Sequence, residues 1–170
     1  MKALLVIDMQ SGIFEDFDYV LDYQNELFEI VNHAIDQARN KNIPILFVQH
    51  TESEGLVEDS DAWQLDRRLH KEKNDFVFSK HHSDAFWDTP LMSYCDQHSI
   101  DELILCGVQS DYCIDTSVRS AHRLGYKVQL ISDGHSTVKN SGLTVRQIID
   151  HHNEILHSFA RVVPLESIDF

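Results

Sequence analysis

The chain has 170 residues, of which 42% are hydrophobic and 25% are charged, and its formal net charge at pH 7 is -14. This length and composition suit one globular domain with its own hydrophobic core, so we expect a single domain over residues 1–170. The acidic balance argues against nucleic acid and against anionic membranes as partners, and it leaves the class of small molecule open.

Strands and helices are expected to alternate from the N-terminus onward. A continuous apolar run at 3–7 predicts a buried parallel strand, and a second strand is expected at 43–48. The acidic segment 51–61 is expected to be a surface loop, and a short third strand follows at 76–78. One face of an expected helix between the first two strands carries the apolar residues Leu27, Val31, Ala34, Ile35 and Ala38.

The same alternation continues through the second half of the chain. Thr89 and Pro90 predict the start of a helix, and further strands are expected at 103–106, 127–131 and 161–163. Repeated strand–helix units predict an α/β fold with three layers (α/β/α) and a mostly parallel, doubly wound, Rossmann-like sheet of about six strands. Apolar stripes mark the two later helices, the first at Ile114, Val118 and Ala121, the second at Val145, Ile148, Ile149, His152, Ile155 and Leu156.

Three chemically useful residues follow the expected strands. Asp8 ends the first strand, Lys80 follows the third, and Cys113 follows the fourth. In open parallel sheets, ligands bind beyond the carboxyl ends of the strands. We therefore expect these side chains to meet at one edge of the sheet and to form a site.

The segment around Cys113 has the pattern of a strand, a sharp turn and a helix start. Gly107 allows the turn, and either Ser110 or Asp111 is expected to cap the helix. Cys113 then lies in the first helical turn, where free N–H groups and the helix dipole lower the pKa of a thiol and stabilise an oxyanion. This predicts a nucleophilic cysteine; the alternative is an inert core cysteine at a helix start.

The cysteine content also indicates the compartment. Cys95, Cys106 and Cys113 are an odd number, and none belongs to a Cys-x-x-Cys pair. We find no signal-peptide pattern, and the first apolar run is too short to span a bilayer. A reducing, cytoplasmic location is therefore expected.

Three motifs follow one another along the chain: LVIDMQ at 5–10, then FSK at 78–80 with AFWDTPL at 85–91, and CGVQSDYCIDT at 106–116. In this order and spacing they resemble the isochorismatase-like cysteine hydrolases, the superfamily that includes nicotinamidases and other small amidohydrolases. The resemblance covers nearly the whole chain, and we expect a homodimer or homotetramer on the same grounds.

The resemblance implies a catalytic triad and a reaction. Cys113 is expected to be the nucleophile, Asp8 the base that takes its proton, and Lys80 the positive charge that favours the thiolate. A cis peptide at Val108–Gln109 and an oxyanion hole made by the N–H groups of Gln109 and Cys113 are also implied. The expected reaction is hydrolysis of an amide-type C–N bond of a small molecule through a thioester.

The resemblance further bears on the pocket and on cofactors. Nicotinamidases of this superfamily carry an Asp-x-His metal motif, which is absent from residues 48–52. His50 and Glu52 alone are a poor ligand set, so we expect no metal and no other cofactor. Among other histidines, His135 is expected in a loop and His152 in the core. The expected pocket walls are Phe14, His50, Trp63, Phe86, Gln109 and Tyr112.

Three alternatives remain open. One is an isochorismatase-type hydrolase of a vinyl ether, which Cys113 disfavours. Another is a nucleotide-binding module, although no Gly-x-Gly-x-x-Gly loop follows the first strand. The last is a non-catalytic redox or binding protein that uses Cys113, for which thiol titration without turnover would be the sign.

Overall fold

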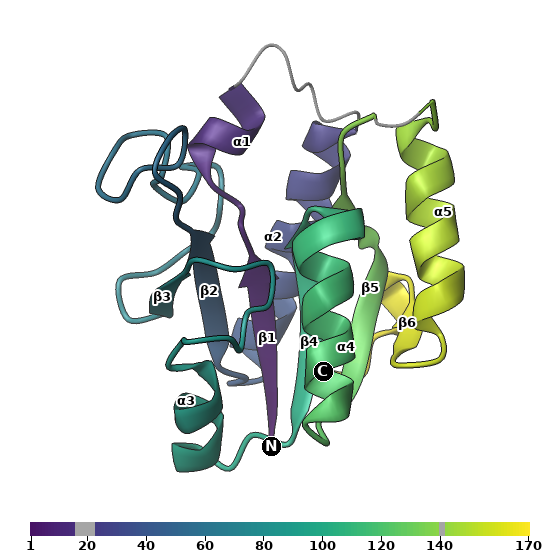
Figure 1. The fold of residues 1–170 in the computed structure, drawn as a ribbon. Helices are drawn as coiled ribbons and strands as arrows, with labels where there is room; N and C mark the ends of the chain where they lie inside the picture. The colour runs from purple at the N-terminus through teal and green to yellow at the C-terminus, as the bar shows by residue number, and fades with distance from the viewer. Residues whose placement is uncertain (16–22, 140–141) are drawn as a thin grey trace.

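A computed structural model describes residues 1–15, 23–139 and 142–170. Its centre is a six-stranded sheet in the order β3-β2-β1-β4-β5-β6, in which every neighbouring pair of strands runs parallel (Figure 1). This confirms the predicted doubly wound α/β class. The strands are β1 (Lys2–Ile7), β2 (Ile45–His50), β3 (Phe76–Lys80), β4 (Glu102–Val108), β5 (Lys127–Ser136) and β6 (Arg161–Val163).

Helices cover both faces of the sheet and complete the three predicted layers. In Figure 1, α3 and α4 lie in front of the strands and α2 lies behind them. None of the helices in the described ranges is long and apolar enough to cross a membrane. The helices are α1 (Ser11–Glu15), α2 (Gln24–Asn40), α3 (Leu91–Gln97), α4 (Asp115–Arg123) and α5 (Val145–Leu156), with a π-helical turn at Ser110–Ile114 and a 3-10 turn at Leu165–Ser167.

The alternation of side chains along each strand divides the core in two. On β1, Leu5 packs with residues of α3, α4 and α5, whereas Leu4 on the opposite face packs against α2. Both side chains are fully buried. A continuous apolar strand is required here because helices cover both faces, as expected for a parallel sheet.

The fifth strand is longer than its apolar run predicts and corrects the expectation for His135. After a register shift between Leu105 and Gly107, the β4–β5 pairing continues through His135 and Ser136. His135 is therefore a buried strand residue and does not lie in a loop. A polar ring can be buried here because both of its nitrogens have partners: they lie 2.8 Å from Ser110 Oγ and 2.9 Å from Asn153 Oδ1.

Candidate active site

The carboxyl ends of three strands, β1, β3 and β4, bring the expected triad together at one edge of the sheet. Asp8 directly follows β1, Lys80 is the last residue of β3, and Cys113 lies in the π-helical turn that follows β4. Asp8 has a left-handed φ of 53°, which turns the chain at the end of the strand and is tolerated by aspartate better than by most residues. The sequence order thus places three side chains from distant segments at one edge of the sheet.

Lys80 is the centre of this cluster. Its Nζ lies 2.8 Å from Asp8 Oδ2, 2.9 Å from His50 Nδ1 and 3.1 Å from Cys113 Sγ. The side chain is completely buried. Burial alone lowers the pKa of this lysine, but the negative charge of Asp8 and the hydrogen bonds to Asp8 and Cys113 outweigh the effect of burial, so the net pKa is raised. Lys80 is therefore a charged ammonium at neutral pH.

Asp8 has one oxygen engaged and one oxygen free. Oδ2 accepts from Lys80, whereas Oδ1 is buried and has no hydrogen-bond partner among the described residues. A buried carboxylate oxygen without a donor is costly, and such exceptions call for an explanation. Because Asp8 also lines a cavity with Cys113, Oδ1 is available to accept a proton there.

The thiol of Cys113 departs from the sequence-based expectation. Burial, and then the negative charge of Asp8, raise its pKa to about 12, although Lys80 acts in the opposite direction. The expected lowering of the pKa is therefore wrong for the resting site. The reason is that Cys113 is only 8% exposed and faces a carboxylate as well as an ammonium. At neutral pH it is a thiol that needs a base.

The turn that carries Cys113 is also built differently from the predicted cap. The residue at the N-cap position is Gln109, and its side chain makes no capping hydrogen bond. Ser110 instead contacts His135, and Asp111 Oδ1 accepts a hydrogen bond from Thr137 Oγ1. Both polar residues tie the turn to β5 and its extension, so the expected Ser110 or Asp111 cap is wrong.

Gly107 sets the path of the chain into this turn. Its φ is +120°, and a Cβ at this position would lie 2.1 Å from the carbonyl oxygen of Ile7. Only glycine fits such a close approach of β4 to β1. The peptide between Val108 and Gln109 is cis, in agreement with what the resemblance implies.

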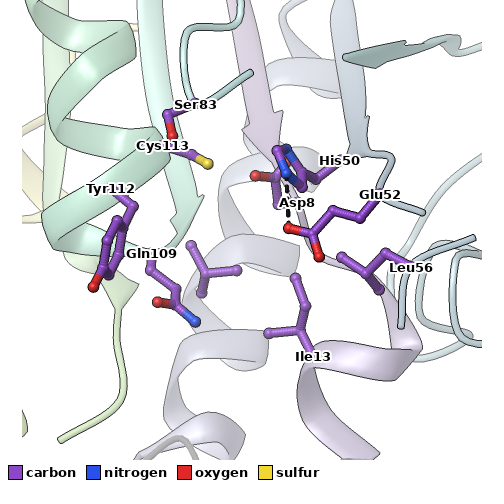
Figure 2. A pocket seen from close by; sticks show the side chains of 10 residues that line it. Asp8, Ile13, His50, Glu52, Leu56, Ser83, Gln109, Tyr112 and Cys113 are labelled. Carbon is purple, nitrogen blue, oxygen red and sulfur yellow. Dashed lines mark ion pairs between the residues drawn. The ribbon is translucent and has the colours of Figure 1, made fainter. Parts of the chain in front are cut away.

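A cavity of about 280 Å³ lies above Asp8 and Cys113. Figure 2 shows its wall, with Cys113 and Tyr112 on one side and His50, Glu52 and Leu56 on the other. Three of the expected wall residues lie here: His50, Gln109 and Tyr112. The complete lining is Asp8, Ile13, His50, Glu52, Leu56, Ser83, Val108, Gln109, Tyr112 and Cys113.

The other three expected wall residues lie elsewhere, because each has a different aromatic or polar partner. Phe14 packs on Phe28 with ring centroids 4.7 Å apart. Trp63 donates from Nε1 to Thr51 Oγ1, and the ring of Phe86 stacks on Tyr126 with ring centroids 5.5 Å apart. The sequence contains an aromatic in each loop but does not show which way its ring turns.

Five lining residues were not predicted as part of the pocket: Ile13, Glu52, Leu56, Ser83 and Val108. A signal existed for Glu52 and Ser83, because they lie two and three residues after the ends of β2 and β3. Ile13 and Leu56 give no such signal. Their position depends on how the loop after β2 folds back on α1, where Gly12 N donates to Ala62 O.

Three side chains of the site carry atoms of the kind that ligate metals. Asp8, His50 and Cys113 each offer one ligand atom within 4.8 Å of the others. However, these three residues are also the hydrogen-bond partners of the Lys80 ammonium. A metal at their centre would face this buried positive charge at close range, so the set does not fit a metal while Lys80 is charged.

Comparison with known proteins agrees with the geometry. The profile of the isochorismatase domain matches residues 2–165. A crystal structure of an isochorismatase family protein is 38% identical, covers 95% of this chain and 96% of its own, and superposes with a TM-score of 0.91. The isochorismatase family protein YddQ of Bacillus subtilis is 26% identical over 99% of this chain and 87% of its own. The nicotinamidase of Escherichia coli is 26% identical over 78% of this chain and 82% of its own.

Proposed function

Because this chain belongs to the isochorismatase family of hydrolases, we propose that it hydrolyses an amide-type C–N bond of a small molecule, with Cys113 as nucleophile. The observation that carries the proposal is the contact of one buried ammonium, Lys80, with both Asp8 and Cys113 at the floor of a cavity. A nucleophile within reach of its base and of a positive charge is the arrangement that covalent catalysis requires. The similarity to a nicotinamidase supports an amide as the class of substrate.

The first step begins from the neutral thiol. Asp8 Oδ1, which has no other described partner, takes the proton of Cys113 as Sγ attacks the carbonyl carbon of the substrate. The C–O π electrons move to oxygen and give a tetrahedral oxyanion. Lys80 stays charged and stabilises the sulfur while it becomes negative. The high thiol pKa thus makes the base necessary.

The second step releases the amine. The backbone N–H groups of Gln109 and Cys113 are proposed to bind the oxyanion, in the role of an oxyanion hole. When the oxyanion collapses, the C–N bond breaks, and the leaving nitrogen takes the proton that Asp8 holds. A thioester on Cys113 remains. Asp8 then activates a water, which attacks the thioester and releases a carboxylic acid and the thiol.

The cavity wall favours an uncharged or cationic substrate. Ile13 and Leu56 supply apolar surface, and Glu52 supplies a carboxylate that is more than half exposed. No lysine or arginine is among the residues that line the described cavity. An anionic substrate such as isochorismate would meet the Glu52 carboxylate without a matching cation, so the wall disfavours the vinyl ether alternative.

The test is ammonia or amine release from a panel of small primary amides, ureides and lactams, measured for the wild type beside Cys113→Ala. Release by the wild type alone, together with a trapped thioester mass on the protein, would support the proposal. Equal release by Cys113→Ala would refute it. An alkylatable Cys113 without turnover on amides would instead favour the redox or binding alternative.

A further inference from the structure

Lys80 and His50 are neighbours on adjacent parallel strands and meet again through their side chains. His50 on β2 is in register with Lys80 on β3, and Thr51 N donates to the carbonyl oxygen of Lys80. Lys80 Nζ lies 2.9 Å from His50 Nδ1. The chemistry assigned above to Asp8, Lys80 and Cys113 gives His50 no function, although it is as close to the ammonium as the other two.

The direction of this contact follows from the chemistry of the two groups. An ammonium carries three donors and no acceptor, so Nδ1 must accept and the ring proton must lie on Nε2. Nε2 faces Glu52 Oε1 at 3.1 Å, where a donor is needed (Figure 2). Burial, and then the charge of Lys80, lower the pKa of His50, so the ring is neutral. The three acceptors around Lys80 therefore match its three protons: Asp8, His50 and Cys113.

The backbone of His50 is fixed from a third direction. Gln10 is fully buried, and its Oε1 accepts from His50 N at 2.7 Å while its Nε2 donates to His50 O at 2.9 Å. This two-sided clamp connects the end of β2 to the segment that follows β1. A side chain held at both its backbone and its ring is suited to hold a neighbour in place.

We propose that His50 is a positioning residue for Lys80: its neutral ring, held by Glu52, accepts one ammonium proton and directs the other two at Asp8 and Cys113. This inference rests on the proposed function, because it concerns the charge that supports the nucleophile. Without the acceptor, one N–H of a buried ammonium has no partner, which disfavours the charged form and frees the side chain to rotate away from sulfur.

Two variants of similar size separate an acceptor from mere bulk. His50→Asn can place an amide oxygen at the branch that Nδ1 occupies, whereas His50→Leu fills the same space without an acceptor. The measurement is the rate of alkylation of Cys113 by iodoacetamide from about pH 6 to pH 9, read by mass spectrometry. Cys113→Ser gives the background from Cys95 and Cys106, which are both buried. Circular dichroism of each variant reports its folding.

We expect His50→Leu to slow alkylation roughly tenfold across this range, the effect of losing one hydrogen bond to a charged group, and His50→Asn to retain most of the rate. Equal rates in wild type and His50→Leu would overturn the inference. Equal losses in His50→Leu and His50→Asn would also overturn it, because bulk or folding would then explain both.

A second position covers the case in which His50→Leu does not fold. Glu52→Leu changes a half-exposed side chain and removes the acceptor of Nε2–H, so it is expected to slow alkylation in the same direction by a smaller factor. An unchanged rate in Glu52→Leu would then count against the inference. Alkylation needs no substrate, so an absence of amide turnover in the wild type would refute the proposed function and leave this test intact.

Discussion

The ammonium of Lys80 lies 2.8 Å from the carboxylate of Asp8, and the two side chains are only 0% and 3% exposed. Buried ion pairs are weak contributors to stability, because removing both charges from water costs about as much as their attraction returns. A pair of this kind at the floor of a cavity is therefore better explained by chemistry than by folding. It also makes the stability of the site depend on both partners together.

Lys80→Met is expected to destabilise the protein by about 3–5 kcal/mol, because the Asp8 carboxylate is then buried without its cation. The double variant Asp8→Asn/Lys80→Met removes both charges and is expected to recover most of that loss. Urea unfolding of the wild type, the single variants and the double variant measures the coupling. All three variants are expected to lack amide turnover. Additive losses in the double variant would contradict a coupled pair.

Gly107 provides a second prediction, with a matched glycine as control. In Gly107→Ala the new Cβ meets the carbonyl oxygen of Ile7 at a positive φ, whereas Gly125 has a φ of +92° and open space around it. We expect Gly125→Ala to cost about 1 kcal/mol from conformation alone, and Gly107→Ala to cost at least about 4 kcal/mol. Urea midpoints measure both. Similar losses at the two positions would show that the contact with Ile7 does not matter.

The cluster of Asp8, Lys80 and Cys113 shows which features of the site can be predicted from the sequence. Asp8, Lys80 and Cys113 could be placed together from the sequence because each lies at or shortly after the end of a strand of a parallel sheet, and topology alone brings those ends to one edge. The direction of the pKa shift of the Cys113 thiol could not be predicted in this way, because it depends on the burial of Cys113 and on its distances to the opposite charges of Asp8 and Lys80. The rule that a helix N-terminus lowers the pKa of a thiol applies to an exposed cysteine and takes no account of burial.

The residues that line the pocket could likewise be predicted only in part from the sequence. His50 was expected in the wall and lines the cavity, whereas the rings of Phe14 and Phe86, which were also expected there, pack into the hydrophobic core. Their loops follow strands too, so position in the chain does not separate them from His50. What decides is the partner each ring finds, such as Phe28 for Phe14, and that partner comes from a distant segment.

The ammonium of Lys80 also predicts metal behaviour. The wild type is expected to keep its full activity in EDTA and to bind no Zn²⁺ at the site, because the ligand atoms of Asp8, His50 and Cys113 already hold the ammonium. Lys80→Ala removes that charge and leaves one carboxylate, one imidazole and one thiol, which suit zinc. Calorimetry with Zn²⁺ is the measurement, and Lys80→Ala/His50→Ala is the control that is expected to lose the binding. Loss of wild-type activity in EDTA that Zn²⁺ restores would refute this prediction.

His135 predicts how stability changes with pH. Burial lowers its pKa to about 4 from an ordinary value of 6.5, so between these values the unfolded chain binds a proton that the folded chain excludes. Stability from this group is therefore complete above pH 6.5 and falls as the pH drops toward 4, by about 3 kcal/mol in total. His135→Gln does not titrate, and its amide can still donate to Asn153. Urea unfolding from pH 7 to about pH 4 is expected to show a steeper loss in the wild type than in His135→Gln. The carboxylates titrate alike in both proteins. If stability falls equally with pH in the wild type and in His135→Gln, the pKa of His135 is not lowered by folding and the prediction is wrong.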